Sequence, residues 1–511
     1  MEVEVDGKNQ VSPKGMQRTK EGGQNRMKKL MGAVLASALM FPVGSANAAE
    51  LLKNLKVSGN LDWQFNSARN VQDFSSAADD AISNAGMRTM LHGDWDVLDD
   101  VHANVTLRKN DTQWGSVASA GQGAGTSQSV TAAGGVLGNT YIDRANVTID
   151  KLFGHLDTTV GRQWYGQPGD LIWYVGPRDE QTQDVQSIDA VRVKTENDWM
   201  MFDGVAGIMT GSTLGSGAGA AADAHTDIKG FNLWWKGLPV KVNTFVWNRV
   251  AHLAAAGNPG AVASANDNLY VYGVKLRGEA AGGWFNLDLA KNAGECRNAT
   301  AASTRCGVSA GAEILSSNYT GHAALLELGF NGDVANVGGI APWASFGWGS
   351  GQSDSQSGTQ DMFYGIGSDW RPGVINRRFT LAGTAAGPDA LGSIAPAAAN
   401  TAVGTNGLSN RVVWGLGTNF TPAALDQLTA GVQLWDYRLQ RNDTKNGQTP
   451  AAAAGNKHLG TELALTANWR HSENVSLSAG WARYFTGGFI KEQVAADSPA
   501  TFVYSDISVK F

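Results

Sequence analysis

The sequence has few charges, few cysteines and almost no long apolar run, and each shortage excludes a class of protein. Charged residues make up 17% of the 511 residues, and 64 glycines accompany them. That composition argues against intrinsic disorder and against a nucleic-acid-binding protein, which would be basic. Beyond one N-terminal segment no stretch offers about 18 consecutive apolar residues, which excludes membrane-spanning helices there. No C-x-x-C-H occurs, so no covalently attached haem is expected.

The apolar N-terminal segment has the three parts of a secretory signal peptide. Lys28 and Lys29 precede an apolar core over 30–43, and Ala46-Asn47-Ala48 follows it. Cleavage is predicted after Ala48; a membrane anchor is the alternative, which the short core and small residues disfavour. Residues 27–48 are thus the expected signal, and 1–26 an extension before the true start. The mature chain, 49–511, carries 33 Lys and Arg against 42 Asp and Glu and is therefore acidic. The signal peptide predicts that it is exported.

Alternation with a period of two runs along the mature chain. Apolar residues occupy every second position from Leu55 to Phe65, and the same pattern recurs at 101–108, 272–277, 462–470 and 503–511. Such a pattern indicates strands with one apolar and one polar face. A soluble sandwich is the alternative, but its strands average about five or six residues. Its dry core would not accept the charges found on the polar faces. The pattern favours an all-β fold, a closed transmembrane antiparallel barrel with an aqueous lumen.

The lengths of the connections predict the strand number. Short turns are expected at 98–100, 150–154, 196–198, 236–239, 279–282, 331–337, 421–425 and 471–474. Longer Gly/Ala/Ser-rich connections are expected near 67–83, 111–139, 164–186, 211–225, 251–267, 293–317, 350–405, 441–456 and 487–499. This arrangement gives about 18 strands with short periplasmic turns and long external loops. A possible extra hairpin at 362–370 leaves 16 or 20 strands open.

Two local motifs, together with this architecture, resemble the outer-membrane porins of Gram-negative bacteria. One is the last strand, Tyr504–Phe511, with its terminal aromatic residue, and the other is Gly161-Arg162-Gln163 before the third long connection. The resemblance implies a water-filled channel for passive diffusion of small hydrophilic solutes and ions, without a cofactor. It implies outer-membrane lipid around the barrel, a homotrimer, and Phe511 as the signal read by the barrel-assembly machinery. It also implies that the third loop folds into the pore as a constriction.

Charges on and near this third loop are the candidate constriction. The loop, 164–186, has an apolar middle that would be costly in water, so we expect it to pack against the barrel wall. Its acids Asp170, Asp179 and Glu180 are expected to face the lumen cations Arg88, Arg108 and Arg144. Opposed charges would set up a field across a narrow aqueous gap. The alternative is that these charges pair with one another and keep the lumen wet.

Two arguments place Arg162 on different faces of the barrel. Strict alternation from Leu156 places it on the lipid side, whereas the resemblance places it in the pore. A bulge at Gly161 would reverse the phase, or the side chain would lie above the bilayer. Both possibilities stay open in the sequence.

Aromatic residues of the third loop allow two interpretations. Trp164, Tyr165, Trp173 and Tyr174 are suited to stacking on sugar rings or aromatic solutes. They are equally suited to packing the loop against the wall, which is the favoured interpretation.

The two cysteines, Cys296 and Cys306, lie in one long connection of a protein exported to an oxidising compartment. A disulfide that pins an external loop is therefore expected. Metal ligation is not, because no histidine lies nearby.

Other functions remain as alternatives to a simple pore. An enzyme is not expected, since the eight histidines are scattered singly and no H-E-x-x-H motif occurs. A gated receptor would need a folded plug before the barrel. A substrate-selective channel for sugars or organic acids, or the barrel sheath of an outer-membrane electron conduit with cytochrome partners, stays open.

Overall fold

A computed structural model describes residues 54–71, 74, 76, 81–111, 140–179, 183, 185–210, 226–253, 265–297, 316–351, 359–378, 407–441, 456–494 and 497–511. The chain divides into two units, Met1–Leu55 and Lys56–Phe511, and the second unit holds the sheet. The expected signal peptide and the extension before it lie outside the described residues. Their assignment stays a prediction.

Eighteen of the 21 strands in the described part of the chain follow one another around the sheet. The first nine are β1 (Leu55–Arg69), β2 (Ile82–Leu98), β3 (Val101–Asp111), β4 (Thr140–Leu152), β5 (Leu156–Gln163), β6 (Ser187–Glu196), β7 (Met200–Thr210), β8 (Thr226–Trp235) and β9 (Lys241–Leu253). The other nine are β10 (Ala265–Ala280), β11 (Gly283–Arg297), β13 (His322–Phe330), β15 (Gly338–Gly349), β17 (Arg411–Pro422), β18 (Leu428–Leu439), β19 (His458–Arg470), β20 (Val475–Thr486) and β21 (Ala500–Lys510).

The remaining described elements are short. The strands β12 (Ser316–Tyr319), β14 (Gly332–Val334) and β16 (Thr359–Gln360) have four residues or fewer. The helices α3 (Ile375–Arg378) and α5 (Gly488–Val494) belong to long connections. Within the described ranges, no helix has the length and apolar character that crossing a membrane requires.

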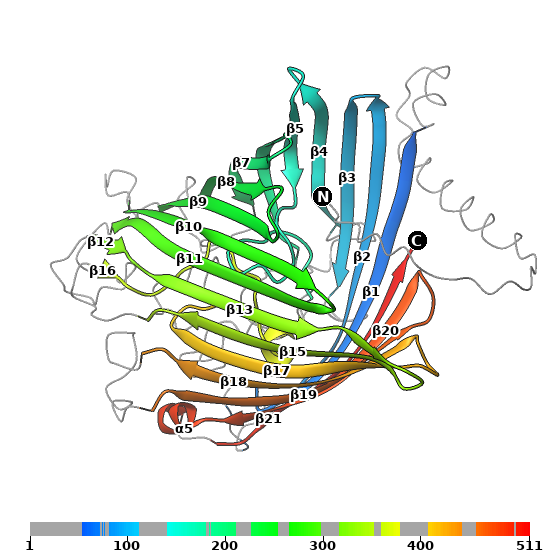
Figure 1. The fold of residues 1–511 in the computed structure, drawn as a ribbon, viewed down its shortest axis with the longest axis vertical. Coiled ribbons are helices and arrows are strands. Elements are labelled where there is room, and N and C mark those ends of the chain that lie inside the picture. The colour runs from blue at the N-terminus through cyan, green and yellow to red at the C-terminus, as the bar shows by residue number, and fades with distance from the viewer. Residues whose placement is uncertain are drawn as a thin grey trace, which may run out of the picture. The chain divides into compact units, whose positions relative to one another are not determined.

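The sheet closes on itself where the last strand meets the first. β21 pairs antiparallel with β1, from Asn60 opposite Lys510 to Arg69 opposite Thr501 (Figure 1, red beside blue). Gly59 and Phe511 exchange two backbone hydrogen bonds of 2.9 and 3.0 Å at the end of this seam. A Cβ at Gly59 would stand 2.6 Å from the Phe511 ring, so glycine leaves room for that ring. Closure satisfies every strand edge, which a barrel in lipid requires.

The closed barrel confirms the predicted fold class and strand number. Short turns join β2 to β3, β4 to β5 and the six other hairpins that the sequence predicted. At one of them Ala281 and Gly282 have φ of +49° and +84°, the geometry of a tight hairpin turn. The extra hairpin at 362–370 does not form, because that stretch bonds to another loop instead.

The two faces of the strands differ as the alternation predicted. Val105, Val160 and Leu465 on the outer face are 45%, 50% and 49% exposed. Thr106 and Asn243, on the opposite phase, are fully buried. Apolar side chains thus cover the outside of the barrel and polar ones line its interior, the reverse of a soluble sandwich.

Candidate functional site

The inner wall of the barrel carries a series of ion pairs between neighbouring strands. The Arg108 guanidinium on β3 lies 2.7 Å from the Asp143 carboxylate on β4, and both side chains are 5% exposed. Arg192 on β6 pairs with Asp203 on β7 at 2.6 Å, in a bidentate arrangement. These pairs neutralise charge locally and keep the interior polar.

The third long loop, 164–186, reaches two opposite parts of this wall. At one end Asp179 lies 3.9 Å from Arg88 on β2, and Arg88 also donates to the Arg178 carbonyl at 2.8 Å. At the other end Asp170 forms a salt bridge with Lys275 on β10. Eight strand positions separate β2 from β10 in a ring of eighteen. The described part of the loop therefore crosses the interior of the barrel.

Aromatic stacking holds the first part of the loop on the wall near β8 and β9. Tyr165 and Trp173 stack at 4.7 Å, and Trp247 of β9 packs against both rings. Asn232 of β8 donates to the Tyr165 hydroxyl at 2.6 Å, and the Arg192 guanidinium lies 4.7 Å above the same ring. Such contacts each contribute about 0.5–1.5 kcal/mol beyond the area they bury. Tyr165 and Trp173 thus pack the loop to the barrel.

Trp164 and Tyr174 lie at the ends of that aromatic group. The Arg144 guanidinium lies 4.6 Å above the Trp164 ring and donates to the Thr106 hydroxyl at 2.8 Å. Tyr174 is buried, its hydroxyl donates to the Pro177 carbonyl at 2.8 Å, and its burial raises the pKa of the phenol well above the ordinary value. Tyr174 is therefore neutral and fixed, whereas Trp164 remains partly exposed beside a cation.

A second loop segment, 359–378, meets the third loop inside the barrel, and sequence reasoning missed it. Backbone amides of Ile366 and Gly367 donate to the Ile172 carbonyl, and those of Asp369 and Trp370 donate to the Asp170 carbonyl. Two side-chain contacts add to this, Arg178 with Asp369 at 3.5 Å and Arg377 with Asp179 at 3.0 Å. The sequence signal for this packing was the apolar Met362-Phe363 pair and Ile366, which are buried.

The segment 359–378 is anchored to the wall on the side of β18 to β21. The Glu462 carboxylate on β19, 1% exposed, accepts the backbone N–H groups of Val374 at 2.5 Å and Ile375 at 3.1 Å. The Tyr437 hydroxyl on β18 donates to the Pro372 carbonyl at 2.9 Å. Arg378 at the end of α3 pairs with Asp506 on β21. Two loop segments, bonded to each other, therefore span the lumen from wall to wall.

Two expected charge contacts are corrected by this arrangement. Asp170 does not face Arg88, Arg108 or Arg144, because the loop carries it to Lys275 across the barrel. Arg108 is already paired with Asp143, and Arg144 stacks on Trp164. Of the expected contacts among described residues, Asp179 with Arg88 is formed.

The position of Arg162 is also corrected. It lies opposite Asp189 in the register of β5 and β6, two residues from the exposed pair Val160 and Val191. The register of these two strands is continuous through Gly161, so no bulge reverses the phase. Arg162 is therefore on the outer face, bonded to Asp189 at 2.8 Å, and the expected pore position is wrong.

Two predicted sites fall at the limits of the described chain. Glu180 and Cys306 lie outside the described residues, so the constriction role of the first and the disulfide remain predictions. Cys296 lies in β11 opposite Asp267. Within the described residues no group of His, Cys, Asp and Glu could hold a metal ion.

Comparison with solved structures identifies the architecture. The crystal structure of OccAB1 from Acinetobacter baumannii is similar over 89% of this chain and 97% of that one, with a TM-score of 0.50 and 10% identity. This chain has the outer-membrane porin fold. Two Pseudomonas aeruginosa structures are also similar, OccK8 (OprE) at a TM-score of 0.49 and 9% identity, and OccK5 (OpdH) at 0.47 and 11%. Each covers 90% of this chain and 99% of its own.

Comparison of the sequence with known families and proteins finds no relative. No protein-family model matches the chain, and no curated protein matches it. At identities near one in ten the likeness concerns the fold alone. The function of this porin-fold barrel has to be argued from its own lumen.

Proposed function

We propose that this chain is an outer-membrane channel for passive diffusion of small hydrophilic solutes and ions, narrowed by two loop segments. The observation that carries the proposal is the bonded pair of segments, 164–179 and 359–378, lying inside a barrel whose outer face is apolar. An apolar exterior requires lipid, and a polar interior requires water. Export to the outer membrane, the barrel-assembly machinery as a folding partner and a homotrimer belong to the same proposal.

Conductance in planar bilayers tests the channel. The refolded mature chain should give discrete steps, and shortening the third loop between Gly166 and Gly176 should enlarge them without abolishing the barrel. Strand ladders rather than loops satisfy the backbone in lipid, so folding should survive. A folded protein that gives no steps would refute the channel. Unchanged steps after shortening would refute the constriction alone.

Selectivity for carboxylate-bearing solutes is a second candidate, favoured by the balance of charge on the inner wall. Arg88, Arg108 and Arg192 each have a carboxylate partner. Among the described residues Arg144 has no carboxylate within salt-bridge distance, and Lys194 on β6 has neither an ion-pair nor a hydrogen-bond partner. These two side chains keep their positive charge available to an anion in the lumen, where low-dielectric walls strengthen the attraction.

Liposome swelling with matched solutes tests this selectivity. The ratio of the swelling rate with gluconate to that with glucose should be higher for the wild-type channel than for a pore without free cations. Arg144→Gln with Lys194→Gln should lower this ratio. Lys229→Gln, on the outer face of β8, is the matched control for the loss of a positive charge. Equal gluconate-to-glucose ratios in the wild-type and double-variant proteins would leave the unselective channel as the function.

A further inference from the structure

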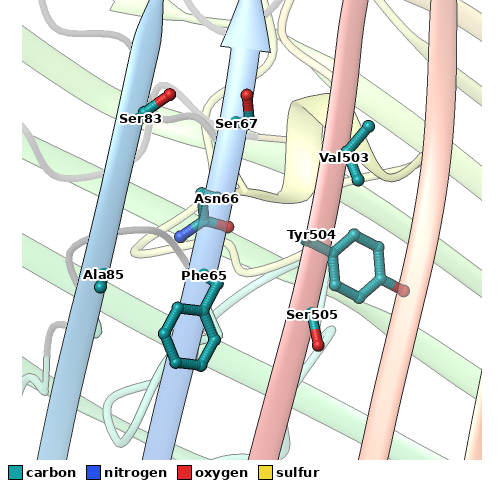
Figure 2. A pocket seen from close by; sticks show the side chains of 8 residues that line it. All are labelled: Phe65, Asn66, Ser67, Ser83, Ala85, Val503, Tyr504 and Ser505. Atoms are coloured by element: carbon teal, nitrogen blue, oxygen red, sulfur yellow. The ribbon is translucent and has the colours of Figure 1, made fainter.

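An apolar hollow with two arginines beside it lies on the outer face of the barrel, at the seam between the first and last strands. The hollow has a volume of about 410 Å³ and is formed by β1, β2 and β21 (Figure 2). The residues that line it from the outer face are Phe65, Ser67, Ser83, Ala85, Val503 and Ser505.

The hollow exists because small side chains stand between large ones. Phe65 and Val503 are 37% and 48% exposed on the outer phase. Between and beside them the strands carry only serine and alanine, so a trough is left in the apolar surface. Asn66 and Tyr504 also line the hollow, but they are on the alternate phase and their side chains are buried.

Two arginines lie on the outer face beside the hollow, one outer-face position nearer the external end of the strands. Arg69 of β1 and Arg483 of β20 are both register partners of Thr501 on β21, one on each side of it. Adjacent strands lie about 4.8 Å apart, so the two Cα atoms are about 10 Å apart. In the following row Val503 lies opposite Ser67 and Trp481, at the edge of the hollow. The arginines thus stand directly above the hollow.

Both guanidinium groups are exposed and lack a carboxylate partner among the described residues. Arg69 has no hydrogen-bond or ion-pair partner there, and Arg483 contacts the Phe485 ring at 5.3 Å. This differs from the outer-face Arg162, whose charge Asp189 neutralises. Two arginines without a described carboxylate partner, at the external ends of β1 and β20, attract an anion, and guanidinium groups bind phosphate with paired hydrogen bonds.

We propose that this surface binds a phosphate-bearing lipid of the outer leaflet, with an acyl chain in the hollow and the phosphate between Arg69 and Arg483. The charge and the apolar trough are complementary to the two halves of such a lipid, and their order along the strands matches its orientation in an external leaflet. The proposal depends on the membrane location given above but not on conduction through the lumen.

Native mass spectrometry of the detergent-refolded mature protein tests the site with bisphosphorylated lipid A as the probe. Phosphatidylcholine supplies acyl chains without a net negative charge, and inorganic phosphate supplies the anion without chains. We expect one lipid A to be retained in preference to both. Each positive charge near a membrane surface contributes about fivefold to binding, so Arg69→Gln with Arg483→Gln should weaken retention about thirtyfold.

Two further variants separate the site from a general effect of charge. Lys229→Gln removes another exposed outer-face cation that has no described partner and should leave retention within twofold. Ser67→Trp fills the hollow without changing charge and should weaken lipid A while leaving inorganic phosphate unaffected. Heat-modifiable gel mobility and conductance, measured on the same samples, should match the wild-type protein because the lumen is untouched.

Several outcomes would overturn the proposal. Equal retention by the double arginine variant, or an equal loss in Lys229→Gln, would mean that lipid binds through unspecific charge. Loss of a multimer rather than of a lipid in the arginine variant would make the surface an interface between copies of the chain. Retention of inorganic phosphate as strong as that of lipid A would mean that the hollow does not bind an acyl chain. Absence of conductance with lipid still bound would refute the channel alone.

Discussion

Replacing Glu462 with alanine should release the segment 359–378 from the barrel wall. The carboxylate is buried and accepts two backbone hydrogen bonds, from Val374 at 2.5 Å and from Ile375 at 3.1 Å. Alanine leaves both N–H groups without a partner away from water, and each such group costs about 1–3 kcal/mol. The docked state of the segment should therefore lose about 2–6 kcal/mol. Because 1.4 kcal/mol is a factor of ten, the undocked fraction should rise at least about thirtyfold.

Single-channel recording detects that change. The Glu462→Ala channel should show openings larger than the wild-type level, or noise between two levels, because the undocked segment no longer fills its part of the lumen. Glu462→Gln is the matched control, since glutamine keeps the size and one acceptor oxygen, and should stay close to wild type. Gly373→Ala should act like the alanine variant at Glu462. The φ of Gly373 is +83°, and a Cβ there would stand 2.2 Å from the Tyr437 hydroxyl.

The result that would refute this reasoning is a folded Glu462→Ala protein with wild-type conductance and noise. Folding is checked by heat-modifiable gel mobility, so that loss of channels through misfolding is not mistaken for a closed pore. Such a result would mean that the contacts with the third loop hold the segment by themselves.

Three further predictions concern the lumen charges and the end of the chain. Arg108→Gln leaves the buried Asp143 carboxylate without its partner 2.7 Å away, so the free energy of unfolding of the barrel should fall by about 3–5 kcal/mol. The loss should appear as a lower temperature of gel-mobility conversion, and adding Asp143→Asn should restore part of it. An unchanged conversion temperature in the single variant would contradict the buried pair. Burial opposes the charge of Asp179, but Arg377 and Arg88 outweigh burial and lower the pKa of its carboxyl below the ordinary 3.8. The stabilisation from this ionised group is present above the unfolded-state pKa and lost as the pH falls through the lower folded-state pKa. The reversal potential depends on the same folded-state ionisation, so the contribution of Asp179 to it should persist as the pH falls and decline only below the ordinary 3.8. Asp179→Asn should lack that acidic step, and an identical step in the variant would assign it elsewhere. Deletion of Phe511 removes the two hydrogen bonds to Gly59 and should lower the amount of folded protein in the outer membrane; normal levels with normal gel mobility would count against this.

The class of fold was decided by local features of the sequence. A strand in a barrel wall contacts lipid on one side and the interior on the other, so every second residue from Leu55 to Phe65 has to be apolar. The connections carry their own composition, which is why the boundaries 164–186 and 487–499 coincide with the strand ends on either side. These signals depend on neighbours within a few residues, and no tertiary contact overrides them.

The partner of each charge was decided by the tertiary structure. Asp170 and Lys275 are 105 residues apart, and Asp179 and Arg377 are 198 apart. Closing eighteen strands brings β10 opposite β2, and folding two loops inward chooses which acid meets which arginine. Alternation fixes which side of the wall a charge occupies, as it did correctly for Arg162, but it carries no information on what lies across the lumen. The sequence therefore determined the wall of this barrel, whereas the contacts across its interior depend on closure, which no local pattern encodes.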